Sequence, residues 1–287
     1  MREREEINTD QRVRNMSRAR IQENTRSKFE IEIRNSVFRA ATATQKERRD
    51  GRGRKCILSM AALFDNIFYV CKTGCSWREL KVEGAAAKTV YHHFNRWSKL
   101  RVFERAFSDL RVKYLQLPRV ALIADCSFVK NLYGRSVLGK SPVDRGRKAT
   151  KVSLLADERG APIYTCFHRG NRADCQTLHH LLHSAASEIG SLEPHGELLA
   201  DKGYDSVLCR TSCQTHGLRP LIPQRRKKDN RSQNSRRVRV EHVFGAIDKC
   251  RRVLVRYDAT FRSFHALACM KVLSQVMWSP TRPHLFS

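Results

Sequence analysis

The sequence has few acidic residues for its size. Its 28 Asp and Glu residues stand against 55 Lys and Arg residues, which gives a formal net charge of +27 at pH 7. Such an excess favours a polyanionic partner. Small nucleic-acid packaging proteins are also basic, but they rarely carry a hydrophobic fraction of 41% over 287 residues. The composition therefore indicates a folded protein that binds nucleic acid.

Long apolar runs are also lacking. No stretch approaches the roughly 18 residues of a membrane-spanning helix, and the first ten residues, MREREEINTD, lack the apolar segment of a signal peptide. We therefore expect an intracellular protein without a membrane partner. Its compartment would follow its host, the cytoplasm in a bacterium and the nucleus in a eukaryote.

The ten cysteines contain no C-x-x-C pair. Cys126 and Cys166 lie in apolar, strand-like runs, which is typical of buried thiols in a reducing compartment. Cys175, His179 and His183 recur at four-residue steps and would share one face of a helix. Two interpretations remain open for them: a helix with some buried polar rings, which is the commoner case, or a zinc site, with which the spacing is compatible.

Composition and periodicity divide the chain into three parts. Residues 1–55 are charged, poor in aromatic residues and end in a basic glycine-rich run, which predicts a flexible extension with a short helix near residues 29–38 at most. Residues 56–115 show helical periodicity. Residues 116–280 alternate between strand-like and helix-like patterns, which predicts an α/β domain.

The helical part contains a buried helix that begins near Leu58 and a second helix over residues 85–99. Val90, Phe94 and Trp97 form the apolar stripe of the second helix, and basic side chains cover the rest. Ser76 can cap a short helix through Leu80. The arrangement suits a helix-turn-helix DNA-binding domain. A plain helical cap on the following domain fits the pattern equally well.

The α/β part begins with a continuous apolar run at residues 120–124, typical of a strand buried on both faces. Two further strands, at 151–156 and 161–167, are joined by a tight turn. Asp174 can N-cap a helix that ends near Ile189. A fourth strand at 198–200, a helix over 206–216, an edge strand at 221–223 and a buried helix from 264 to 278 follow. This order predicts a mixed sheet flanked by helices.

Three acids stand at the ends of these elements. Asp125 follows the first strand, Asp201 follows the fourth, and Glu241 lies on a helix after a very basic loop. Neighbouring strands and a helix packed across their ends would bring the three carboxylates together. Converging carboxylates repel one another, and hard cations such as Mg²⁺ or Mn²⁺ relieve this. Two ions roughly 3.5–4 Å apart can cleave and join phosphodiesters.

Basic side chains lie near these acids and in the helical part. The loop from Arg225 to Arg239 is the most basic stretch of the chain. Because phosphate contacts come mainly from lysine and arginine, the residues expected to contact DNA are Lys88, Arg96, Lys99, Arg147, Lys148, Lys202, Arg225, Arg226, Lys227, Lys228, Arg237 and Lys249.

Four segments resemble the DDE transposases of bacterial insertion sequences, namely the IS-four/IS-five superfamily, which is related to Harbinger-type transposases. Residues 74–107 are similar to the family's N-terminal helical region. The runs DCSFVK (125–130), LADKGYD (199–205) and RVEHVFG (239–245) resemble its first, second and third acid blocks. The resemblance covers about residues 56–278.

This resemblance implies an RNase H-like catalytic domain in which Asp125, Asp201 and Glu241 ligate Mg²⁺ or Mn²⁺. It also implies binding to terminal inverted repeats and target DNA, by a homo-oligomer on paired ends. One departure bears on activity. Relatives often have a lysine seven residues after the glutamate, whereas this chain has Asp248, followed by Lys249. A catalytically weakened or domesticated DNA-binding relative is therefore the alternative, and a nuclease without strand transfer is a third.

Overall fold

We analysed a computed structural model of the chain. It describes residues 31–43, 56–115, 121–158, 160–192, 196–224, 238, 241–245 and 248–276. Of the expected DNA contacts, Arg225, Arg226, Lys227, Lys228 and Arg237 lie outside these residues. No helix in the described part of the chain is both long and apolar enough to cross a membrane.

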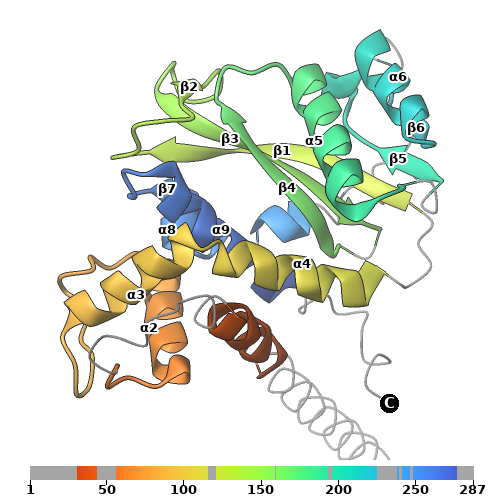
Figure 1. Ribbon diagram of the computed structural model, residues 1–287. Helices are drawn as coiled ribbons and strands as arrows, with labels where there is room; N and C mark the ends of the chain where they lie inside the picture. Colours follow the sequence, from red (N-terminus) through yellow and green to blue (C-terminus); the bar gives the residue numbers. More distant parts are fainter. Residues whose placement is uncertain are drawn as a thin grey trace, which may run out of the picture.

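The N-terminal helices lie under one face of a sheet (Figure 1). They are α2 (Met60–Thr73), α3 (Ala87–Lys99) and α4 (Val102–Leu115). Ser59 caps α2, and Gly74 ends it in the left-handed conformation. The short helix expected after Ser76 is a turn. Val90, Phe94 and Trp97 are buried as the apolar stripe predicts.

The sheet is mixed. Its strands are β1 (Ala121–Asn131), β2 (Gly139–Lys140), β3 (Lys148–Asp157), β4 (Pro162–Arg169), β5 (Glu197–Leu199), β6 (Arg219–Leu221) and β7 (Val255–Arg256). The main path runs β4–β3–β1–β5–β6, in which β3 is antiparallel to β1 and β4, while β1, β5 and β6 are parallel. This is the mixed sheet that the order of the elements predicts, and it agrees with the RNase H-like domain that the family resemblance implies.

Helices cover both faces of the sheet (Figure 1). Helices α5 (Asp174–Ile189) and α6 (Val207–Thr215) pack on the face that carries Leu122, Ala124 and Leu198. Helix α4, the short helix α8 (Arg251–Leu254) and α9 (Phe261–Val276) pack on the face that carries Ile123 and Leu199. Residues that alternate along β1 therefore belong to two different cores.

The first strand is longer than predicted. It continues for six residues past Asp125, because its pairing with β3 extends to Lys130↔Ala149. Its pairing with β5 stops at Ile123↔Leu199. Asp125 therefore does not end the strand. It lies within β1, just past the point where the neighbouring strand β5 stops.

Smaller differences concern the ends of elements. Asp174 is the first residue of α5 rather than its cap, which is Ala173, because its carboxylate bonds the Lys151 ammonium instead. Strand β6 contains Pro220 and pairs only with β5 among the described strands, as an edge strand can. Ser206, where the predicted helix begins, caps α6 through a hydrogen bond from the Cys209 amide.

Part of the N-terminal extension is ordered. Residues 31–43 are helical and bury Ile33, Val37, Ala40 and Ala41 in the core shared by α2, α3, α4 and the sheet. The Ser36 hydroxyl donates to the Ala106 carbonyl at 3.2 Å. The prediction of a flexible segment is therefore wrong for these residues: the segment's composition cannot bury much on its own, but α2 and α4 supply the opposite apolar surface.

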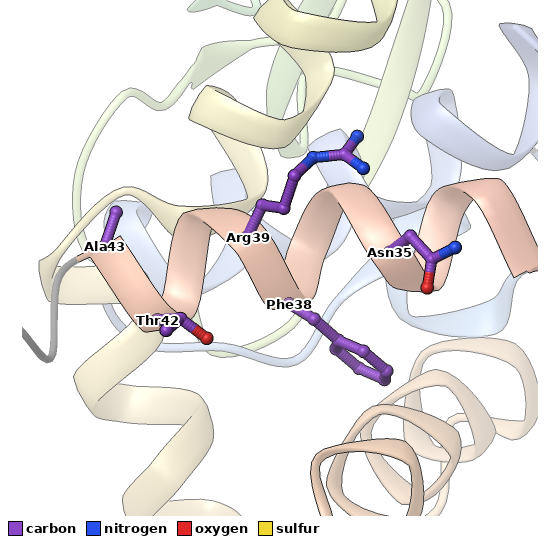
Figure 2. A pocket seen from close by; sticks show the side chains of 5 residues that line it. All are labelled: Asn35, Phe38, Arg39, Thr42 and Ala43. Carbon is purple, nitrogen blue, oxygen red and sulfur yellow. The ribbon is translucent and has the colours of Figure 1, made fainter.

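The other face of this helix is open. Asn35, Phe38, Arg39, Thr42 and Ala43 line a hollow of about 530 Å³. Figure 2 shows Phe38 and Arg39 leaving opposite sides of the helix. The helix is thus amphipathic, with one stripe in the shared core and the other exposed.

Candidate active site

Asp125 and Asp201 stand at matching places on neighbouring parallel strands. Ile123 of β1 pairs with Leu199 of β5, and each aspartate lies two residues further along its chain. Two residues are one full period of a strand, so Asp125 stays on the face of Ile123. The backbone at Asp201 is also extended, with φ −72° and ψ 162°. The register thus places both carboxylates at one edge of the sheet and on one face.

Local hydrogen bonds orient both carboxylates. Oδ1 of Asp125 accepts the Cys126 amide at 2.7 Å, and Oδ1 of Asp201 accepts the Lys202 amide at 2.7 Å. Asp201 is also the cap of the short 3₁₀ helix η2 (Lys202–Tyr204). Both side chains are half-buried. A carboxylate that accepts a hydrogen bond from the amide of the next residue keeps a fixed direction, as a metal ligand requires.

A direct contact joins the two acid blocks. The Tyr204 hydroxyl, which is buried, donates to Sγ of Cys126 at 2.9 Å. Burial raises the pKa of Tyr204 well above its usual value, and the nearby Cys126 and Asp125 raise it further. The phenol therefore stays protonated and remains a donor. This contact locks the segment after Asp201 against the residue after Asp125.

Glu241 lies on a helical segment that faces the same side of the sheet. Residues 241–245 are helical, and Val243 and Phe244 are buried in the core that contains Ile123 and Leu199. Glu241 itself is exposed. Strands β1 and β5 and the helical segment 241–245 thus all contribute side chains to the same core.

The three carboxylates do not meet at contact distance. Among the described residues, Asp125, Asp201 and Glu241 do not form a group whose ligand atoms all lie within 4.8 Å of one another. The donor set nevertheless fits a hard cation, since all three side chains offer carboxylate oxygens and two are fixed in register on adjoining strands. Mg²⁺ and Mn²⁺ both prefer such ligands.

Two arginines after the third acid have a structural role, which their position in the chain does not reveal. Arg256 is fully buried and donates to the Ser136 carbonyl at 2.6 Å and the Thr150 hydroxyl at 3.2 Å. Arg252 donates to the Cys75 carbonyl at 2.7 Å and lies 3.5 Å from Asp258. They tie the third-acid region to the sheet and to the turn after α2.

The expected DNA contacts that the structure describes come from several elements. Lys88 and Lys99 are exposed on α3, while Arg96 on the same helix is half-buried. Exposed residues elsewhere are Arg147 and Lys148 at the start of β3, Lys202 beside Asp201, and Lys249. Their role in binding DNA remains a prediction.

Cys175, His179 and His183 of α5 do not form the zinc site that the sequence allows. His179 instead hydrogen-bonds the Ser212 hydroxyl of α6 at 2.6 Å. Among the described residues, the groups with ligand atoms within 4.8 Å are Cys166–His168–His180 and Glu104–His265–Cys269. The ten cysteines are all free thiols.

Comparison with known families assigns both parts of the chain. The family described as "Transposase DDE domain" matches residues 118–276. The family described as "Putative transposase of IS4/5 family" matches residues 37–107. A curated relative, the "Putative transposase for insertion sequence element IS402" of Burkholderia cepacia, is 28% identical over 131 residues. That alignment covers 44% of this chain and 62% of the relative.

Similar solved structures include two transposase complexes. A piggyBac transposase synaptic complex with hairpin DNA has a TM-score of 0.39 and 12% identity, over 70% of this chain and 52% of that chain. A Mos1 transposase paired-end complex with the left transposon end has a TM-score of 0.26 and 10% identity, over 71% of this chain and 81% of that chain.

Proposed function

Because the chain belongs to the transposase DDE domain family, we propose that it is a transposase that cleaves DNA at the ends of a mobile element and joins the 3′-ends to target DNA. The observation that carries the proposal is the register of β1 and β5, which sets Asp125 and Asp201 side by side at one sheet edge. The family match and the excess of basic residues support a DNA substrate.

In this mechanism Asp125, Asp201 and Glu241 would hold two Mg²⁺ or Mn²⁺ ions. When bound, such ions lower the pKa of water or of a 3′-hydroxyl and stabilise the charge on the leaving oxygen. The chain itself supplies position. The amides of Cys126 and Lys202 orient the first two carboxylates, and the buried Val243 and Phe244 fix the helix that carries Glu241.

Basic residues would hold the DNA strand beside these acids. Lys202 is exposed directly after Asp201, where its ammonium can neutralise a backbone phosphate. We propose that α3 contributes Lys88, Arg96 and Lys99 to binding the element ends, and that the protein acts as a homo-oligomer on paired ends. The basic residues between 225 and 239, all of which lie outside the described part of the chain, would add further phosphate contacts.

Substitution of Asp201 by Asn tests the proposal. The amide keeps the shape of the side chain but removes the charge that a divalent cation needs. We expect DNA cleavage in Mg²⁺ or Mn²⁺ to fall by at least about 10³-fold, with DNA affinity unchanged or slightly higher. The measurement is cleavage of labelled element-end duplexes. An Asp201→Asn protein that cuts as well as the parent would sink the assignment.

The alternative of a catalytically weakened DNA-binding relative can be tested at Asp248. Its side chain is exposed, but partial desolvation of the carboxyl group raises the pKa of Asp248. A carboxylate there would repel DNA phosphate where relatives often place a lysine. We expect Asp248→Lys to raise strand transfer by about tenfold, roughly 1.4 kcal/mol. A parent protein that binds element ends but cuts in neither Mg²⁺ nor Mn²⁺ would favour the binding-only alternative.

A further inference from the structure

A pocket with polar side chains lies on the α5 face of the sheet, near the part of β1 that follows Asp125. It has a volume of about 490 Å³ and is enclosed by the β2–β3 loop and the β4–α5 loop. The lining side chains that matter here are Lys140, Ser141, Lys151, Asn171, Arg172 and Asp174. Three are cations and one is an anion, so the pocket is basic on balance and suits an anionic ligand.

The single acid in the pocket is neutralised internally. Lys151 is 4% exposed, and its ammonium bonds the Asp174 carboxylate and the Arg172 carbonyl. It also lies 5.2 Å from the centre of the Phe128 ring. Lys151 and Asp174 therefore form an ion pair that holds α5 against β3. The charges left for a ligand belong to Lys140 and Arg172.

The Arg172 side chain is held by a buried histidine. Burial, with Arg172 itself nearby, lowers the pKa of His168 to about 3, so the ring is neutral at physiological pH. Arginine only donates hydrogen bonds, so Nδ1 of His168 accepts from Nη1 of Arg172 at 3.3 Å. Nε2 then carries the proton and donates to the Ser153 hydroxyl at 2.8 Å. One N–H of the guanidinium is used in this way, and its other four can serve a ligand.

Ser141 supplies an independent sign of a ligand. It is 1% exposed and lines the pocket, and among the described residues its hydroxyl has no hydrogen-bond partner. A buried hydroxyl without a partner is costly. A phosphate oxygen in the pocket would accept that hydroxyl's hydrogen bond.

The sequence around Lys140 and Ser141 has the spacing of a nucleotide-binding loop. Residues 134–141 read GRSVLGKS, which fits the pattern G-x-x-x-x-G-K-S/T. The fold does not provide the helix that such a loop requires, because β2 and a turn follow instead. Added side chains would collide with Asn131 at Gly134 and with Asn171 at Gly139. These glycines therefore serve packing, and the pattern does not by itself indicate ATP.

The pocket lies at the same sheet edge as Asp201. Lys151 pairs with Phe128, which is three residues past Asp125 and so roughly 10 Å further along β1. On the other side, a side chain at Gly203 would come within 3.5 Å of Asp174. The pocket lies on the α5 face of the sheet, because Lys151 bonds Asp174 of α5, whereas Asp125 and Asp201 stand on the face of Ile123. A DNA strand that runs from the acids around this end of the strands would reach the pocket.

We propose that Lys140, Ser141 and Arg172 form a binding site for a backbone phosphate of the DNA strand that lies across the candidate active site. The identity of the strand rests on the proposed function, whereas phosphate binding by the pocket does not. None of these three residues is among the DNA contacts predicted from the sequence. The site would position the strand, with no part in the chemical step.

The experiment measures how the affinity of the full-length protein for a labelled duplex depends on salt. Each phosphate contact contributes about −0.9 to the slope of log K against log salt. Lys140→Gln and Arg172→Gln should each make the slope shallower by about 0.9. The control is Arg219→Gln, because Arg219 is exposed at the start of β6, at the opposite end of the parallel strands. Its slope should not change.

Two further variants separate the possible outcomes. Arg172→Lys keeps the charge, so it should restore most of the slope if Arg172→Gln acts by losing a phosphate contact and not by unfolding. Asp201→Asn should abolish cleavage and keep the slope, which separates failure of the catalytic proposal from failure of this one. Unchanged slopes in both glutamine variants would overturn the phosphate site. Micromolar, Lys140-dependent binding of Mg·ATP would assign the pocket to a nucleotide and would also overturn it.

Discussion

Arg256 shows how a charged side chain can hold a fold together. Its guanidinium is fully buried and bonds the carbonyls of Ser136 and Asp258 and the hydroxyl of Thr150. Burial lowers the pKa of this arginine, and Asp258 opposes the shift. The side chain thereby joins β7 to the loop that follows β1 and to β3, next to the strand that carries Asp125.

Removal of this side chain should therefore destabilise the fold. We expect Arg256→Ala to lower the free energy of unfolding by about 3 kcal/mol, because the Ser136 and Asp258 carbonyls lose a buried donor and the Asp258 carboxylate loses a nearby positive charge. Urea unfolding gives the value from the midpoint and slope. Arg262→Ala, at an exposed position on α9, is the control and should stay within about 0.5 kcal/mol of the parent. A similarly small effect at Arg256 would contradict the structural role.

Single side chains also mark where sequence reasoning succeeds and fails. A helix over residues 206–216 was predicted, and α6 lies there with Ser206 as its cap, because a cap depends only on residues three positions away. Asp174 was predicted to cap α5 and does not, because its partner is Lys151 on a distant strand. Local interactions are readable from the sequence, while competition from another element is not.

Helices α4 and α9 are joined by a polar cluster in an otherwise apolar contact. His265 Nδ1 lies 2.9 Å from Oε1 of Glu104, and its Nε2 lies 3.7 Å from Sγ of Cys269. Burial disfavours the charged ring, but Cys269 and Glu104 outweigh burial and raise the pKa of His265 to about 10. The protonated histidine therefore forms an ion pair with Glu104 at neutral pH.

This cluster predicts a pH dependence of stability. The pKa of His265 is higher in the folded protein than the usual value of 6.5, so its stabilising effect is complete below pH 6.5 and is lost as the pH rises towards 10. We expect Glu104→Gln to cost roughly 1–3 kcal/mol at pH 6.5 and much less at pH 10. Urea unfolding across this range tests the idea, with Glu83→Gln as the exposed control. A cost that does not change with pH would contradict it.

The order of helices and strands was predictable, whereas their exact lengths were not. Strands β1, β3, β4, β5 and β6 and helices α5, α6 and α9 lie close to where the apolar period predicts them, because burial on one or two faces produces that period. The short elements β2, β7 and α8 were not predicted. The extra length of β1 was missed. Ser127 and Lys130 read as loop residues, but pairing with β3 continues beyond them. Backbone pairing does not require an apolar side chain, so the sequence does not reveal it.

The acids of the candidate site were predictable for the same reason. Asp125 and Asp201 follow apolar strand segments, and the order of the elements is enough to make those strands neighbours. The phosphate pocket was not predicted, although Lys140 and Ser141 stand in a recognisable spacing. Its walls come from two loops that are separate in the sequence and meet only because β3 pairs with both β2 and β4.

The two parts of the chain share one core. Buried side chains of the helix 31–43, of α2, α3 and α4, and of one face of the sheet form a single cluster. The sequence divides the chain at residue 115, but the described residues show α4 packed on α9 and on this cluster rather than a helical domain with a core of its own. A DNA-binding surface on α3 would therefore be rigidly connected to the acids on the sheet.

This shared core predicts that the molecule unfolds as a unit. Val37 is fully buried in it, whereas Arg39 is exposed on the same helix and lines the open hollow (Figure 2). Val37→Asp places a charge in the core and should lower the free energy of unfolding by about 3 kcal/mol or more. Arg39→Asp changes the charge further but leaves the core intact, and should stay within about 0.5 kcal/mol.

Two probes decide whether the parts are coupled. In a Trp278→Phe background, tryptophan fluorescence reports on the helical part, where Trp77 and Trp97 lie, and far-UV circular dichroism reports on the whole backbone. For one cooperative unit, both signals change at the same urea concentration, and Val37→Asp shifts both midpoints equally. If the fluorescence midpoint moved and the main circular dichroism transition stayed in place, the helical part would unfold independently, and a rigid link from α3 to the acids would have to be abandoned.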